Sequence, residues 1–432
     1  MKDLHKVTAL SLEKLRENGA DMAQCSATYA ERQEFTAELG EFSLLRTLFD
    51  TSLSLTGFQE HRKGTASLNR LDEDAIAAGA AECMASAKAA DPDEAWNLAP
   101  AQAPETFHSG IEEPDLEAFF ARLRELIGDI KAKYPAIRLL QVIATAIRQE
   151  SVYRNSNGVC WTGKAGGYSL SLEYNAMDGE ETTSFFYTTS VFDDLSRPLL
   201  ELDGVDGALA DTVRQLHPTP LEGKFIGTVI LTPDCLNDML SSIVGNFLSD
   251  TVILSGTSPW RDKLGQQVAD ERISLCVPID DPRIVFPDYW TGEGYKAENQ
   301  TYIEKGVLKA FCLSDYVSRK TGEKRAVNSS DSYVLAPGDV PLADLIAGVE
   351  RGLLVGRFSG GSPAGNGEFS GVAKNSFLIE NGKVTRPLVE TMISGNLADL
   401  LGNVRGISRE VIRNGMTVLP WLASDGVNIS GK

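Results

Sequence analysis

Apolar residues recur at spacings of three and four between residues 236 and 248, which is the pattern of a helix with one buried face. The residues before it form a continuous apolar run and predict a buried strand. Thr232 is a favourable N-cap, Pro233 suits the first helical position, and Asp234 places a negative charge at the positive end of the helix. The pattern therefore predicts a strand that leads directly into a capped amphipathic helix.

The first half of the chain mixes helical and alternating patterns, with Pro-rich or polar segments between them. Helices are expected at 3–18, 72–90, 116–133 and 205–216; strands at 23–33, 34–50, 51–70 and repeatedly within 137–190; and a structureless loop at 91–115. Asn157-Gly158 and Asp178-Gly179 are strong hairpin signals. The segment 217–220, with two prolines, is expected to end this part of the chain.

The second half reads mainly as strands joined by Gly, Pro, Asn and Asp turns, apart from the helix described above and a short one near 396–401. Asn381-Gly382 predicts a type I′ hairpin. The Gly-rich segment 359–367 is interpreted as a flexible hairpin loop, because no Lys-Ser/Thr pair follows it as in a phosphate-binding loop. These patterns predict an α+β protein with an α/β domain at 1–220 and a β-rich domain at 221–432.

Composition narrows the function classes. The chain has 432 residues and a formal net charge of −19, from 60 acidic and 41 basic residues, which disfavours direct binding of nucleic acid. Neither a signal peptide nor a membrane-spanning run is apparent, so a cytoplasmic location away from membranes is expected. The six cysteines are scattered without a C-x-x-C pair and are expected to be reduced. The four histidines are too far apart in sequence to build a local metal site.

The polar face of the helix at 236–248 holds the candidate chemistry. A zinc peptidase would place two His and a Glu on such a face, since residues about one turn apart project in the same direction. This chain offers Ser241, Ser242 and Asn246 instead. Hydroxyls and a neutral amide are poor zinc ligands, and none of the three is a good general base. The frame of a metal site is present without residues that bind a metal.

Three segments carry a resemblance to a known family: 255–282, 302–322 and 369–404, the last of which contains LIENGKVTRPLVETMISGNL. On these residues the chain resembles the TldD/PmbA family, also called TldD/TldE or "modulator of DNA gyrase", over essentially its whole length. The resemblance implies an N-terminal α/β domain, a β-rich C-terminal domain, and a heteromeric zinc peptidase that acts on unfolded peptides. The sequence departs from the family pattern at 292–295, where a more acidic stretch is expected.

In that family the TldD-type subunit has an H-E-x-x-x-H helix and a later Cys that completes the zinc site, whereas the TldE/PmbA type lacks them. The two His positions correspond to Ser241 and Asn246 and the Glu position to Ser242, and the tail 415–427 contains no cysteine. The resemblance therefore implies a TldE/PmbA-type subunit that has neither metal ligands nor catalytic residues of its own. Zinc is expected only in a TldD-type partner, and no cofactor is expected in this chain.

Three functions stay open at this point. The chain can be a non-catalytic subunit that pairs with a TldD-type zinc subunit and helps to form a groove for unfolded peptides. It can be a stand-alone peptidase with Ser241 or Ser242 as nucleophile, although His217 is the nearest histidine in sequence and lies in an expected linker. It can also be a regulatory or binding protein. Alone, the chain is expected to form a homodimer, with the second domain providing most of the contact and the loop 359–367 near the shared cavity.

Overall fold

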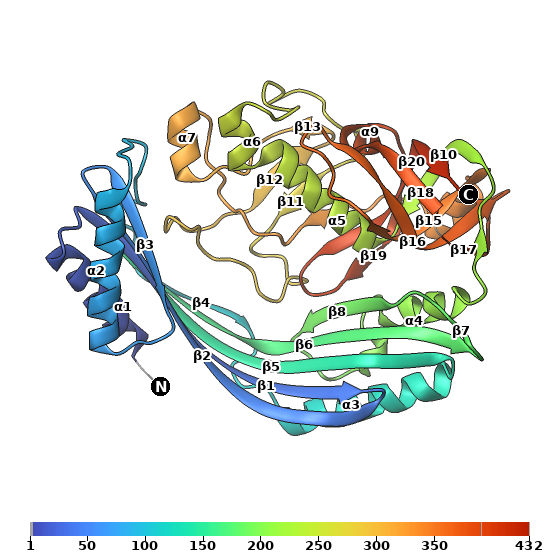
Figure 1. The fold of residues 1–432 in the computed structure, drawn as a ribbon, viewed down its shortest axis with the longest axis horizontal. Coiled ribbons are helices and arrows are strands. Elements are labelled where there is room, and N and C mark those ends of the chain that lie inside the picture. Colours follow the sequence, from blue (N-terminus) through green and yellow to red (C-terminus); the bar gives the residue numbers. More distant parts are fainter. Residues whose placement is uncertain (1–2, 390, 432) are drawn as a thin grey trace.

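The computed structural model describes residues 3–389 and 391–431; Glu390, inside the family-like segment, lies outside the described residues. The first domain is built on an eight-stranded sheet in which the order β3-β2-β1-β5-β6-β4 is continuous, and β7 and β8 pair with β6 (Figure 1). Its strands are β1 (Met22–Glu38), β2 (Glu41–Gln59), β3 (Arg62–Leu68), β4 (Glu105–Gly110), β5 (Ile137–Asn155), β6 (Cys160–Asp178), β7 (Glu181–Thr182) and β8 (Phe186–Phe192).

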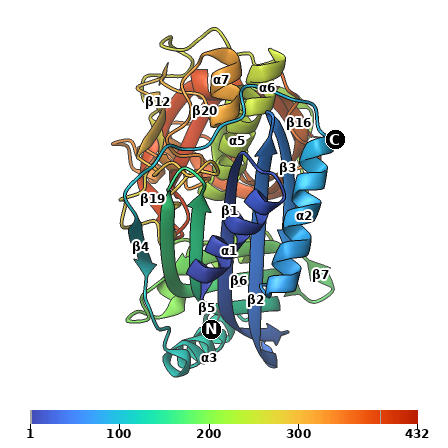
Figure 2. The same ribbon diagram turned by 90° about the vertical axis from the view of Figure 1, so that its left-hand side faces the viewer.

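The long strands β1, β2, β5 and β6 are covered by different helices at their two ends. At one end, α1 (Leu4–Glu17) and α2 (Glu73–Ala89) pack on the sheet, as Figure 2 shows from the front. At the other end, α3 (Leu116–Lys133), η1 (Leu199–Glu201) and α4 (Val205–Arg214) form a second core with β1, β5, β6 and β8. The four helices expected in this half are confirmed, each within two residues of its predicted ends.

Two predictions for the first domain are wrong. The turns do not fall at 33/34 and 50/51: β1 ends in a turn at Leu39-Gly40, and β2 in one at Glu60-His61, each with two consecutive residues at positive φ. The observed strands have 17 and 19 residues, much longer than ordinary strands, and neither Gly nor Pro stands at 33/34 or 50/51 to break them. The segment 91–115 is also not structureless, because β4 pairs in parallel with β6 at the sheet edge. Only Phe107 of β4 is buried, so the strand shows no clear alternation.

The second domain is a twelve-stranded mixed sheet in the order β13-β12-β11-β14-β20-β10-β15-β16-β17-β9, with β18 and β19 attached to β20. Its strands are β9 (Thr219–Pro220), β10 (Lys224–Leu231), β11 (Leu275–Val277), β12 (Gln300–Glu304), β13 (Val307–Leu308), β14 (Val334–Leu335), β15 (Arg351–Ser359), β16 (Glu368–Glu380), β17 (Lys383–Val389), β18 (Thr391–Asn396), β19 (Val404–Arg413) and β20 (Val418–Ser430). Its helical elements are α5 (Pro233–Ile243), the π-helical turn η2 (Val244–Leu248), α6 (Asp250–Ser255), α7 (Asp315–Thr321), α8 (Leu342–Ala347) and α9 (Leu397–Gly402).

The hairpin signals are confirmed. Asn381 and Gly382 have φ values of 50° and 74°, as a type I′ turn requires, and they join β16 to β17. Asn157-Gly158 and Asp178-Gly179 likewise connect paired strands. The short helices α7 and α8 were not predicted, because six or seven residues are too few to show a helical period. The described helices include none that is long and apolar enough to cross a bilayer.

The segment 286–297 of the second domain packs on β4, β5 and β6 of the first. Trp161 donates its indole N–H to the Gly294 carbonyl at 2.9 Å, and Tyr289 donates its hydroxyl to the His108 carbonyl at 2.9 Å. Gly294 has a φ of 89°, and a Cβ there would lie 2.3 Å from Tyr153, so this position needs glycine. The departure from the family pattern at 292–295 therefore falls on an interdomain contact.

Candidate functional site

The helix α5 is positioned by its first residues. The Thr232 hydroxyl accepts the Cys235 N–H at 3.4 Å and donates to the Gly356 carbonyl of β15 at 3.0 Å, which fixes the start of the helix against the sheet. The apolar face is buried as predicted. The helix then continues through η2, which is π-helical, rather than as regular α-helix up to residue 248.

The three motif positions follow one another along this helix. Ser241 is exposed and lies beside Tyr333, whose pKa is raised by burial and by Asp331, with the Ser241 hydroxyl opposing the rise. Ser242 donates its hydroxyl to the Asp238 carbonyl at 2.9 Å within the helix. Asn246 donates its amide to the carbonyls of Pro363 (3.1 Å) and Ala364 (3.2 Å). Asn246 therefore tethers the Gly-rich loop to the helix.

These residues do not fit a zinc ion. The Asn246 amide nitrogen already donates to two carbonyls, and the Ser242 hydroxyl is satisfied by its own helix. Neutral hydroxyls and amides also lack the charge and basicity of the imidazole and thiolate ligands that zinc prefers. Within residues 3–389 and 391–431, no three side chains of His, Cys, Asp or Glu come together as a metal site would need.

A serine nucleophile would need a base, and the histidines make their contacts elsewhere. His217 lies after α4 and contacts Glu181 at 2.6 Å and Asp178 at 3.1 Å, at the β6–β7 hairpin, where both carboxylates raise its pKa. His5 contacts Thr162 of β6. In the part of the chain that the structure describes, no histidine is hydrogen-bonded to Ser241 or Ser242. His217 therefore does not serve as a base for either hydroxyl in this arrangement.

A chamber of about 210 Å³ opens between the two domains at the N-terminal end of α5. Its lining includes five large apolar side chains, together with Asp211 of α4 and Asp234 of α5. A smaller cavity of about 140 Å³ adjoins it and shares Asp234, while adding Asp238 and Arg357. The apolar side chains are Phe186, Leu354, Phe377, Ile412 and Trp421. Sequence reasoning missed this chamber because its walls come from α4, α5, β8, β15, β16, β19 and β20, which only the tertiary fold brings together.

Burial raises the pKa values of the carboxylates at the chamber and at the cavity beside it. Asp234 retains contact with solvent, yet protein surrounds it on most sides, and this burial, helped by Asp238, raises its pKa to about 6. Burial also raises the pKa of Asp238, and Arg357 opposes that rise. The side-chain oxygen of Asn237 and the Nε of Arg357 are buried without a hydrogen-bond partner among the described residues. The one sequence signal for the chamber is Asp234, which the helical pattern explains equally well as a charge that favours the helix N-terminus.

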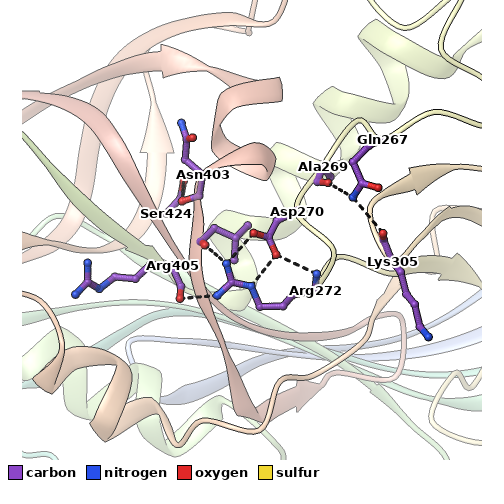
Figure 3. A network of polar contacts seen from close by, with 9 residues as sticks. Gln267, Ala269, Asp270, Arg272, Lys305, Asn403, Arg405 and Ser424 are labelled. Carbon is purple, nitrogen blue, oxygen red and sulfur yellow. Dashed lines mark hydrogen bonds and ion pairs between the residues drawn. The ribbon is translucent and has the colours of Figure 1, made fainter.

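The family-like segments 255–282 and 369–404 meet at Arg272 (Figure 3). Its guanidinium donates to Asp270, to the Arg405 carbonyl at 2.7 Å and to the Val404 carbonyl at the start of β19. The Asp270 N–H donates to the Leu401 carbonyl of α9 at 2.9 Å. In this network, Asp270 and Arg272 of the segment 255–282 hold the loop after α6 against the C-terminal end of the segment 369–404. Their contacts are structural.

Comparison with known proteins agrees with this architecture. Residues 223–431 match the family model described as "PmbA/TldA metallopeptidase C-terminal domain". The chain is 24% identical to a "Metalloprotease PmbA homolog" of Haemophilus influenzae, over 99% of this chain and 96% of that protein. The crystal structure of TldE from Thermococcus kodakarensis superposes with a TM-score of 0.83 at 21% identity, covering 99% of this chain and all of that one. A putative modulator of DNA gyrase from Bacteroides thetaiotaomicron superposes with a TM-score of 0.82 at 25% identity, with both chains fully covered.

Proposed function

Because the chain belongs to the PmbA/TldD family, we propose that it is a TldE/PmbA-type subunit, which pairs with a TldD-type zinc subunit and helps to form the groove in which unfolded peptides are cleaved. One observation carries the proposal. Ser241, Ser242 and Asn246 occupy the three motif positions. Ser242 and Asn246 donate their side-chain hydrogen bonds to backbone carbonyls within the protein. The subunit keeps the scaffold of the family and leaves the metal chemistry to its partner.

The alternatives have less support. A stand-alone serine peptidase lacks a base beside Ser241 or Ser242 among the described contacts, so nothing would remove the hydroxyl proton. A role in modulating gyrase is supported only by the names that structural relatives carry. A cytoplasmic location belongs to the same proposal.

The zinc content of the purified chain tests the proposal. We expect elemental analysis to find far less than one zinc per chain, because three strong ligands are needed and this helix supplies none. The isolated chain should not hydrolyse unfolded peptides, whereas the mixture with a TldD-type subunit should. In that mixture, Ser241→Ala and Ser242→Ala should leave the rate within about twofold. Cleavage by the isolated chain that survives chelators and is abolished by either substitution would establish the serine peptidase instead.

A further inference from the structure

One edge of the first domain is an open strand. β3 pairs with β2 only from Leu53 onward, and Asn69, just after β3, accepts a hydrogen bond from the Thr51 hydroxyl. Residues 41–50 of β2 therefore have β1 on one side and no strand on the other within the described chain (Figure 1). This open edge carries large exposed apolar side chains, with Leu45 at 65% and Phe49 at 63% of full exposure. Leu44 and Phe42 are also exposed, and Phe42 contacts Phe120 of α3 with 4.9 Å between the ring centroids.

Apart from one irregularity at Ser43, where the pairing with β1 shifts register, the open edge has few of the features that keep a strand unpaired. Natural edges are blunted by Lys, Pro, bulges or very short length, because a row of free N–H and C=O groups is a template for another strand. Residues 41–50 contain neither Lys nor Pro, and their three charges are Glu41, Arg46 and Asp50. Exposure of these Leu and Phe side chains to water is unfavourable in free energy, and burying them against a partner strand would be favourable. Such an edge is expected to be covered.

We propose that the open edge of β2 pairs antiparallel with the same edge of a second copy, about a two-fold axis through Leu48. An isologous contact of this kind places residue i opposite residue 96−i. Arg46 of each copy then lies opposite Asp50 of the other, so two opposite-charge pairs form across the axis. An axis through Arg46 would instead place the two guanidinium groups together, and an axis through Leu45 would place Glu41 opposite Phe49. Charge complementarity therefore selects Leu48.

The neighbouring strand extends this complementarity. Within one chain, Arg46 contacts Glu34 of β1 at 2.9 Å, and Asp50 contacts Arg32 of β1 at 3.0 Å. Pairing of two copies produces a row of alternating charge across four strands: Glu34 and Arg46 of one copy, then Asp50 and Arg32 of the other. On the opposite face, Phe49 of each copy lies opposite Thr47 of the other and diagonal to the other Phe49. The pairing thus gives opposite-charge contacts on one face of the sheet and contacts to Phe49 on the other.

This proposal goes beyond the proposed function, which concerns pairing with a zinc subunit, and assigns a surface to self-association of the chain. It places the contact in the first domain, whereas the sequence led to the expectation of a contact mainly through the second. Sedimentation velocity across a concentration series tests it. The wild-type chain should be dimeric at tens of micromolar, and Leu45→Glu with Phe49→Glu should weaken the dimer at least 100-fold. Ile226 of β10 is an apolar residue with a similar exposed fraction, 71%, and Ile226→Glu should leave the stability of the dimer unchanged.

Cross-linking tests the register independently of the charge variants. Leu48→Cys should form an intermolecular disulfide under mild oxidation, because residues on the axis face each other at a distance that a disulfide can span. Leu45→Cys should not, because the two copies of residue 45 would lie roughly 20 Å apart along the strands. A monomeric wild type would overturn self-association and this surface, and would leave the proposed pairing with a zinc subunit standing. A dimer that persists in the Glu variants, or a Leu48→Cys chain that cross-links only to a co-expressed zinc subunit, would overturn this surface alone.

Discussion

Single residues in this chain have roles that their sequence context did not reveal. In the sequence, Asp234 reads as a charge that complements a helix dipole, and the structure places it in the lining of a chamber between the domains. By the resemblance, Asn246 corresponds to a metal-ligand position of the TldD-type subunit, and in the structure it holds a loop by two hydrogen bonds. In both cases the residue type was compatible with the sequence interpretation. Residues distant in sequence decided the role.

Asp234 gives a prediction about pH. Its pKa is about 6 in the folded chain and about 4 when unfolded, so the folded state holds the proton more tightly and loses stability as pH rises from about 4 through 6. Asp234→Asn should therefore unfold at higher urea than wild type at pH 8, and the difference should vanish at pH 4. We expect a gain of about 1 kcal/mol, since contact with water screens part of the effect. Equal midpoints at pH 8 would contradict this.

At the scale of elements, the sequence predicted what local patterns encode. The capped start of α5, its buried face, the I′ hairpin at Asn381-Gly382 and the helices of the first domain follow from residues close together in the chain. It did not predict β4, whose pairing with β6 joins residues 56 apart, or the turn positions in β1 and β2. The same holds for the candidate site. The motif positions lie on one helix and are predicted from the sequence, whereas the chamber is lined by both domains and is not.

Asn246→Ala tests the link between α5 and the loop 359–367. The substitution removes both amide hydrogen bonds, so amide hydrogen exchange should accelerate in the loop while the core of β16 stays protected. The free energy of unfolding should fall by only about 1 kcal/mol, since water can satisfy the freed carbonyls. Ser241→Ala, on an exposed position of the same helix, is the matched control and should change neither quantity. Unchanged exchange in the loop of Asn246→Ala would show that other contacts hold it.

At the scale of the molecule, a second interdomain contact joins the Pro-rich segment after α2 to α7. Trp96 stacks on Tyr316 with 3.8 Å between ring centroids, and Asp93 accepts hydrogen bonds from Tyr316 at 2.8 Å and Lys320 at 2.9 Å. Lys320, the Ala95 N–H and Tyr316 lower the pKa of Asp93 to about 2. The segment that looked structureless therefore carries one of the links between the domains.

Asp93→Asn should show the opposite pH trend to Asp234→Asn. A carboxylate whose pKa is lowered by folding stabilises the folded chain above its unfolded pKa of about 4, and this stabilisation is lost as pH falls toward 2. The variant should unfold at lower urea than wild type at pH 7, and the two should converge near pH 2. A deficit that stays constant with pH would mean that the lost packing, rather than the charge, matters.

The central place of β20 in its sheet has a consequence for synthesis. β20 pairs with β10, β14, β18 and β19, all of which precede it in the chain. Until the ribosome has released residues 418–430, these partners lack the strand that unites them, and much of the apolar core beneath them stays open. The strands of the first domain's sheet are all made before residue 193, and its last helix, α4, ends at Arg214. The first domain can fold during translation, and the second domain has to wait, exposed to chaperones and proteases, until its last strand emerges.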